Sequence, residues 1–167
     1  MINDHTVLIL GAGASHAFGL PLGPGLGKYI IEGLTPKDQG KPGDLAKILQ
    51  TLEFDDTLIK GFRKDFNGCN LDSIDDFVRK NRDYADVART SIAWCISKHE
   101  NVQRLDTDHS GTWYHFLWQR LAQANQLVDN QLCILTYNYD RAFEEFLFRS
   151  YQNSSPSTDT DQDTTTD

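Results

Sequence analysis

The sequence has little cysteine and no long apolar run, and each of these absences excludes a class of protein. Three of its 167 residues are cysteine, far apart at positions 69, 95 and 133. This spacing fits neither a disulfide framework nor a paired-cysteine zinc module, and it favours a reducing cytoplasm. No apolar stretch approaches the roughly 20 residues of a membrane span, and the N-terminal MINDH is no basic signal-peptide region. The composition therefore predicts a cytoplasmic protein without membrane contact.

Basic residues are scarce as well. Lysine and arginine total 16 against 24 acidic residues, and the formal net charge is −8. Without a basic stripe, direct nucleic-acid binding is not indicated. Residues 153–167, NSSPSTDTDQDTTTD, have no aliphatic or aromatic side chain and cannot offset the entropy of ordering them. We expect one folded domain over residues 1–152 and a disordered acidic tail over 153–167.

The apolar run Val7–Leu10 ends at a glycine-rich turn, GAGAS. Unbroken apolar residues are typical of a strand buried on both faces of a parallel sheet. Gly11 and Gly13 leave the turn free of side chains, and Ser15 is expected to cap the following helix. Such a turn suits a phosphate group, and the alternative is an ordinary strand-to-helix turn. His16 stands where a dinucleotide fingerprint needs its third glycine, which excludes the standard dehydrogenase motif.

Helical periodicity dominates the chain between this strand and a second one. The segment GPGLGKY at 23–29 imitates a P-loop, but Leu22 and Tyr29 replace two required residues, which excludes that motif. Pro21, Gly23, Pro24 and Gly25 are instead expected to form a loop before a helix that begins at Leu26. Ser73 is expected to cap a long helix, either continuous or kinked, with Asp75 in its first turn, near the helix dipole. Trp113 and Phe116 begin an apolar stripe that continues through Leu117, Leu121 and Ala124. Helices are predicted over residues 26–34, 44–52, 56–66, 73–100, 112–129 and 141–151.

The histidines offer no recognisable metal site. Asp106, Asp108 and His109 lie in a polar segment whose spacing matches no zinc pattern, so no metal is expected. His16 and His115 are interpreted as packing or surface residues.

The second strand, Leu132–Thr136, is followed by the polar residues Asn138 and Asp140. Ligands bind at the carboxyl ends of strands in open α/β sheets. Asn138 offers an acceptor and two donors, and Asp140 adds a charge, so either residue can orient a ribose or a water. Asp140 is also expected to cap the helix that follows.

Three segments in this order resemble the motifs of SIR2-like domains in bacterial antiphage defence proteins, a sirtuin-related family. They are VLILGAGAS with FGLP after it, SIDDFV, and ILTYNYDRAFE. The resemblance implies a Rossmann-like α/β fold, a parallel sheet with helices on both faces and a helical insertion, here incomplete at the C-terminus. It also implies NAD as ligand or substrate, hydrolysed to ADP-ribose and nicotinamide. The cofactor-binding positions implied are Gly11, Ala12, Gly13, Ser15, Asp75, Thr136, Asn138 and Asp140.

The resemblance also assigns roles to these positions. The turn from Gly11 to Ser15 would contact the phosphates and the adjoining ribose. Asn138 would be the catalytic residue, which holds the ribose near the scissile bond and positions water. Asp140 would support the nicotinamide pocket, and Asp75 would line the same site. An amide has almost no basicity, so Asn138 would act by orientation and not as a general base.

The sequence departs from this family in one respect that affects function. Related domains carry a catalytic histidine after the T-x-N-x-D motif, but no histidine follows His115. Two functions stay open: an NAD hydrolase completed by self-association or by a partner that supplies the missing elements, and an inactive NAD-binding or interaction fragment. A deacylase is a weaker alternative, since the sirtuin zinc module is absent. An incomplete sheet would also expose an edge that another chain can pair with.

Overall fold

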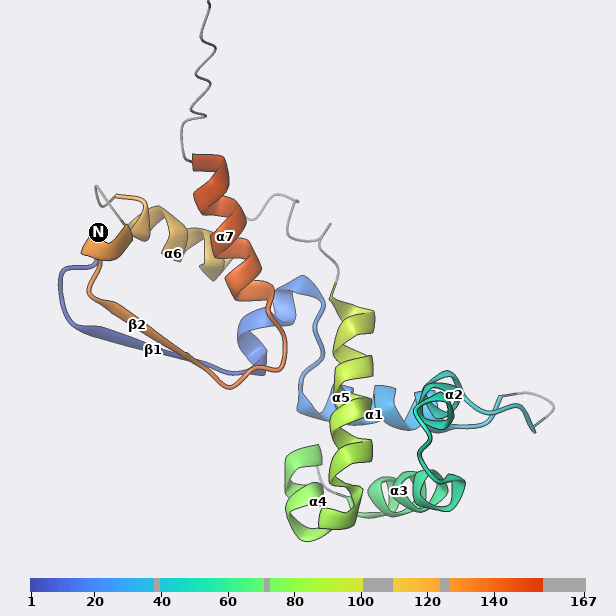
Figure 1. The fold of residues 1–167 in the computed structure, drawn as a ribbon. Coiled ribbons are helices and arrows are strands. Elements are labelled where there is room, and N and C mark those ends of the chain that lie inside the picture. The colour runs from blue at the N-terminus through green and yellow to red at the C-terminus, as the bar shows by residue number, and fades with distance from the viewer. Residues whose placement is uncertain (38–39, 71–72, 101–109, 124–126, 155–167) are drawn as a thin grey trace, which may run out of the picture.

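The computed structural model describes residues 1–37, 40–70, 73–100, 110–123 and 127–154. It is a mostly helical α/β structure, in which the described strands form one two-stranded parallel sheet at one end and helices α1 to α5 form the other end (Figure 1). The strands are β1 (Thr6–Leu10) and β2 (Leu132–Thr136). The α-helices are α1 (Gly23–Leu34), α2 (Asp44–Thr51), α3 (Asp56–Gly68), α4 (Ile74–Lys80), α5 (Ala85–His99), α6 (Trp113–Leu121) and α7 (Ala142–Ser154), and the 3-10 helices are η1 (Ala12–Phe18), η3 (Arg82–Tyr84) and η5 (Leu127–Asp129).

The two predicted strands are direct neighbours. Thr6 pairs with Leu132 and Leu10 with Thr136, in a parallel register without a bulge. Antiparallel strands can be joined by a tight turn, but a parallel pair needs a long crossover, and helices supply it here. The prediction of a parallel α/β sheet with these strands side by side is confirmed.

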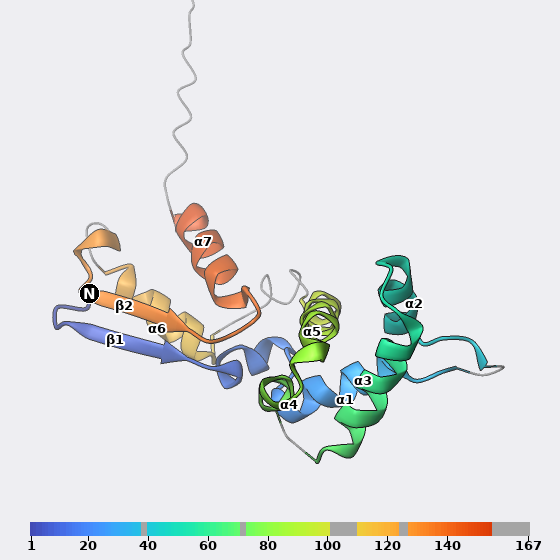
Figure 2. The ribbon, with the colours of Figure 1, turned by 60° about the horizontal axis from the view of Figure 1, so that its bottom comes forward.

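The strands are buried on one face only, so the prediction of burial on both faces is wrong for the described structure. Helices α6 and α7 lie on the same side of the sheet, above the strands in Figure 1, and Figure 2 shows the same end of the molecule turned by 60°. Leu8 and Leu10 contribute to the core, whereas Val7 and Ile9 are 61% and 63% exposed. Leu135 of β2 is 47% exposed in the same way. Successive side chains of any strand point to opposite faces, so an unbroken apolar run does not by itself show that both faces are covered.

Several helices differ from the prediction at their ends. Residues 23–25 form the first turn of α1 and not a loop, because Pro24 is tolerated at a helix start, where its missing N–H is not needed. Ser73 caps α4 as predicted, since its hydroxyl accepts from the N–H of Asp76. The long helix after Ser73 is not continuous: Asn81, at φ −131° and ψ 68°, separates α4 from η3 and α5.

Helix α6 is shorter than predicted and presents a different face. It ends at Leu121, and Ala124 lies outside the described residues. Phe116, which was assigned to the apolar stripe, is 59% exposed, whereas Tyr114 is fully buried. The buried stripe runs through Tyr114, Leu117, Trp118 and Leu121, at the i, i+3, i+4 and i+7 positions of a helix.

Helix α7 extends beyond the predicted domain boundary. It includes Asn153 and Ser154, which were assigned to the tail. Residues 155–167, the rest of the predicted tail, lie outside the described residues. Among the described helices none combines the length and the apolar character that crossing a membrane requires.

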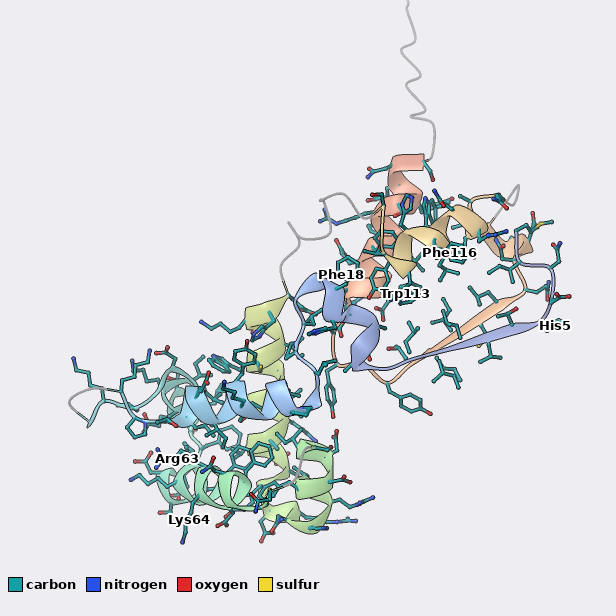
Figure 3. All side chains as sticks on the ribbon, turned by 180° about the vertical axis from the view of Figure 1, so that it is seen from behind. His5, Phe18, Arg63, Lys64, Trp113 and Phe116 are labelled. Atoms are coloured by element: carbon teal, nitrogen blue, oxygen red, sulfur yellow. The ribbon has the colours of Figure 1, made fainter. Side chains whose placement is uncertain are left out.

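Aromatic packing holds η1, α6 and α7 together at the carboxyl ends of the strands. The ring of Tyr114 stacks on Phe18 with centroids 4.3 Å apart, and it meets Phe143 and Phe146 of α7 at 5.1 and 5.2 Å. Figure 3 shows Phe18 and Trp113 near one another in this region. These contacts fix the backbone around the polar residues that follow each strand.

Candidate functional site

The segments that follow β1 and β2 lie side by side because the strands are parallel and in register. The N–H of Tyr137 donates to the carbonyl of Leu10 at 3.0 Å, so the pairing continues one residue past β2. The N–H of Asn138 then donates to Thr136 Oγ1 at 3.1 Å. This hydrogen bond from the backbone to the Thr136 side chain two residues earlier forms a local turn, which holds Asn138 at the edge of the sheet.

Ser15 lies at the centre of a polar cluster, the Ser15 cluster, made by Ser15, Tyr114, Asn138 and Asp140. Its hydroxyl donates to Asp140 Oδ1 at 2.8 Å and accepts from Asn138 Nδ2 at 3.1 Å. The hydroxyl of Tyr114 lies 3.1 Å from the same oxygen. Asp140 Oδ1 also accepts from the N–H of Ala142, the first residue of α7. Ser15, Tyr114 and Asp140 are all buried, so this cluster joins three distant segments inside the protein.

The structure therefore brings together three of the residues that the sequence singled out: Ser15, Asn138 and Asp140. The contact with Ala142 confirms that Asp140 supports the start of the next helix. The expected capping role of Ser15 is wrong. Ser15 lies inside η1, whose N-cap is Gly11 and has no side-chain cap hydrogen bond. The glycine turn leads into this seven-residue 3-10 helix and not into a longer α-helix.

The glycine turn itself is open. A Cβ atom added at Gly11 or Gly13 would meet no atom within 4 Å, so the fold does not require glycine at either position. The turn lines an open hollow of about 310 Å³ together with Ala12, Ala14 and Trp113. The indole N–H of Trp113 donates to the carbonyl of Ala14 at 2.9 Å, which ties α6 to the end of the turn.

Asp75 contacts the loop after β2 through Tyr139, which is not part of the Ser15 cluster. Its carboxylate accepts from the hydroxyl of Tyr139 at 2.5 Å, and Tyr139 lies between Asn138 and Asp140 in the sequence. Desolvation and this hydrogen bond raise the pKa of Tyr139. Asp75 thus links α4 to the loop after β2.

Two tyrosines in these contacts, Tyr114 and Tyr139, were missed at the sequence level. The signal for Tyr114 was the second apolar stripe of α6, which begins at this residue. Burial raises the pKa of Tyr114 to about 12, and the charges of Asp140 and Glu144 act in the same direction, against the hydrogen bond with Ser15. Tyr139 has no periodic signal, only its place between two polar residues of the motif.

One atom of the site lacks a hydrogen bond. Within the described part of the chain, Asn138 Oδ1 is buried and has no donor. Buried polar atoms are paired in the great majority of cases, and an unpaired one is expensive. This oxygen is an unpaired acceptor that lies buried at the carboxyl ends of the strands.

The described residues contain no group of three or more potential metal ligands. Asp106, Asp108 and His109 lie outside the described residues. His16 is exposed, with Nδ1 3.1 Å from the carbonyl of Leu20, and His115 contacts Gln119.

Comparisons of the chain with protein-family models, curated proteins and solved structures find no match. Its function is therefore inferred from the geometry of the site and from the resemblance of its motifs.

Proposed function

We propose that this chain is a SIR2-like module that binds NAD at the carboxyl ends of β1 and β2. The observation that carries the proposal is the Ser15 hydroxyl, which bonds to both Asn138 and Asp140 across separations of 123 and 125 residues. The two motifs with ligand-binding chemistry thus lie in contact, which supports a single site made from both. Carboxyl ends of neighbouring parallel strands are the usual place for a nucleotide in open α/β folds.

The parts of the site suit different parts of NAD. The open turn of Gly11, Ala12 and Gly13 would receive the pyrophosphate, because backbone N–H groups at the first turn of a helix lack intrahelical acceptors. Asn138 Oδ1 is unpaired but buried in the structure without ligand, and it would accept from a ribose hydroxyl once the atoms that cover it move aside. The Ser15 hydroxyl is fully buried and already bonded to Asp140 and Asn138, so its contribution is to hold Asn138 and not to touch the phosphates.

Thr136, Asp140 and Asp75 act on the same site through the loop after β2. Thr136 accepts from the N–H of Asn138, Asp140 anchors the loop to α7, and Asp75 holds Tyr139. In this proposal they shape the nicotinamide side of the pocket and need not bond to the ligand themselves.

The Rossmann-like sheet with helices on both faces belongs to the same proposal. In such a fold, further chain must pack on the sheet face that carries Val7, Ile9 and Leu135. This face is exposed in the described structure. The second copy or partner chain expected from the sequence would cover it. Sedimentation velocity over a range of concentrations checks for self-association.

NAD hydrolysis is the second candidate function, and the buried free acceptor of Asn138 favours it. In the reaction the bond between nicotinamide and ribose breaks, nicotinamide leaves with the bonding electron pair, and water adds to the ribose carbon and loses a proton. Asn138 Oδ1 can orient that water or a ribose hydroxyl, but an amide takes up no proton at neutral pH. Because no histidine follows His115, we expect binding with little turnover by this chain alone. In the family that it resembles, such turnover serves antiphage defence.

Titration calorimetry with NAD tests binding, and chromatography of nicotinamide and ADP-ribose tests turnover. Asn138→Ala should weaken NAD binding by about 1–3 kcal/mol, the usual effect of a lost buried hydrogen bond. Gly13→Val should abolish binding without unfolding the protein, because a side chain there fills the hollow and meets no protein atom.

Gly68→Val is the matched control, since a Cβ at Gly68 also meets nothing within 4 Å and this glycine lies at the end of α3. It should bind NAD as the wild type does. A folded wild-type chain that binds no NAD would refute the proposal and favour an interaction fragment. Robust hydrolysis that survives Asn138→Ala would refute the catalytic role of Asn138.

A further inference from the structure

We propose that Ser15 and Asp140 are positioning residues that fix the orientation of the Asn138 side-chain amide, so that the site presents an acceptor and selects a ligand group that donates a hydrogen bond. Such a group is a hydroxyl or a water. The inference rests on the proposed function for the identity of the ligand, but the orientation of the amide follows from the Ser15 cluster itself.

The hydrogen-bond capacity of one oxygen atom decides the orientation. A serine hydroxyl has one proton and two lone pairs, and an ionised carboxylate only accepts. Ser15 gives its proton to Asp140 Oδ1 at 2.8 Å. Its two lone pairs then face Tyr114 Oη and the Asn138 amide, both at 3.1 Å. Both of these neighbours must therefore donate to it.

Tyr114 can donate because its hydroxyl keeps its proton over the ordinary pH range, its pKa being about 12. Its ring is fixed between Phe18 and Phe143, so the hydroxyl cannot turn away from Ser15. Asn138 can donate only through Nδ2. If the amide turned by half a rotation, two oxygens would face each other without a proton between them, and Nδ2 would be the buried group without a partner. The amide is thus held with Oδ1 unpaired, and because this oxygen is buried, a ligand hydroxyl or a water reaches it only when the atoms that cover it move.

Asp140→Asn and Ser15→Ala test this relation together. Asp140 Oδ1 accepts from both Ser15 and the N–H of Ala142, so an amide at position 140 keeps its oxygen toward Ser15. Asp140→Asn should therefore keep the ligand preference at Asn138. Ser15→Ala should remove the preference, since nothing then holds Nδ2.

The first measurement is made on the protein without ligand. In nuclear magnetic resonance, the side-chain amide protons of Asn138 should exchange with water about tenfold or more slowly than those of the exposed Asn67, because the amide is hydrogen-bonded. Ser15→Ala should remove this protection, and Ser91→Ala, at a serine that is equally buried but lies in α5, should leave it unchanged. Unprotected Asn138 amide protons in the wild type would overturn the inference without any variant.

The second measurement uses NAD and analogues that lack one hydroxyl of the nicotinamide ribose. The wild type should bind one of the analogues about tenfold more weakly than NAD. Asn138→Ala and Ser15→Ala should bind that analogue and NAD with equal affinity. Equal discrimination in wild type and Ser15→Ala would overturn the inference. If no form binds NAD, the proposed function fails, and the amide protection alone decides whether the orientation is fixed.

Discussion

Removal of the Ser15 hydroxyl should destabilise the fold far more than removal of another serine hydroxyl with the same burial. Ser15 and Ser91 are both fully buried. Ser15 Oγ has three side-chain neighbours from α6 and from the loop after β2. Ser91 Oγ donates to the carbonyl of Val87, one turn earlier in its own helix α5. The two Ser→Ala substitutions remove the same atom and differ in what they leave behind.

The magnitude follows from the partners. Ser15→Ala takes the acceptor from Tyr114 and Asn138 and one donor from the Asp140 carboxylate. A buried polar group left unsatisfied costs about 1–3 kcal/mol, and more when it is charged. The three losses share one atom and are not additive, and Asp140 keeps the N–H of Ala142. We expect a total of about 3–5 kcal/mol. Ser91→Ala should cost about 1 kcal/mol or less, because the Val87 carbonyl can keep its helical hydrogen bond.

Urea unfolding followed by circular dichroism measures both values, with the wild type as reference. A domain of this size has a total stability of about 5–15 kcal/mol. Ser15→Ala should therefore lower the midpoint urea concentration by a large fraction of its wild-type value. The slope of the transition should stay the same, since the surface exposed on unfolding does not change. If Ser15→Ala costs no more than Ser91→Ala, Ser15 does not join the three segments and the reasoning is refuted.

Three further predictions concern burial. Leu10→Ala should destabilise the protein by about 2–5 kcal/mol because Leu10 faces the core, whereas Ile9→Ser on the exposed face should change the free energy of unfolding of the dilute monomer by about 0.5 kcal/mol or less; comparable losses in urea unfolding of the monomer would show that this face is covered within one chain. Burial raises the pKa of Tyr114 from 10.0 to about 12, so the stability that its hydroxyl contributes is fully present below about pH 10 and is lost as the pH rises through 12; Tyr114→Phe should lose this pH dependence, and an unchanged alkaline profile would contradict it. Cys133 is exposed, whereas Cys95 is buried with its pKa raised to about 11 by burial; a thiol reagent should modify Cys133 first and Cys95 on unfolding, and the reverse order would contradict the burial of α5.

Local patterns determined most of the secondary structure. The apolar runs at β1 and β2 were recognisable because each is short and is followed by polar or glycine residues, and their parallel pairing followed from the helical crossover between them. The start of α4 was recognisable because Ser73 is a good helix cap. The position of the break at Asn81 was not recognisable, since the periodicity of the apolar residues continues across it.

The site was predictable in part for the same reason. Asn138 and Asp140 follow one strand and the GAGAS turn follows its neighbour, so their proximity comes from strand pairing alone. The role of Ser15 did not follow, because its partners depend on how η1 turns and on which face α6 presents. Tyr114 lies 99 residues away and enters the site only through its packing on Phe18 and α7.

The sequence by itself thus determined where the strands are, that they run parallel, and which chemistry lies at their carboxyl ends. These properties depend on residues close together in the chain and on the geometry of a strand. The tertiary structure decided that one sheet face is exposed, that Ser15 is a buried centre of hydrogen bonds, and that Asn138 keeps a free oxygen. Each of these depends on which distant side chains pack together, because burial and hydrogen-bond direction are set by neighbours in space and not by neighbours in sequence.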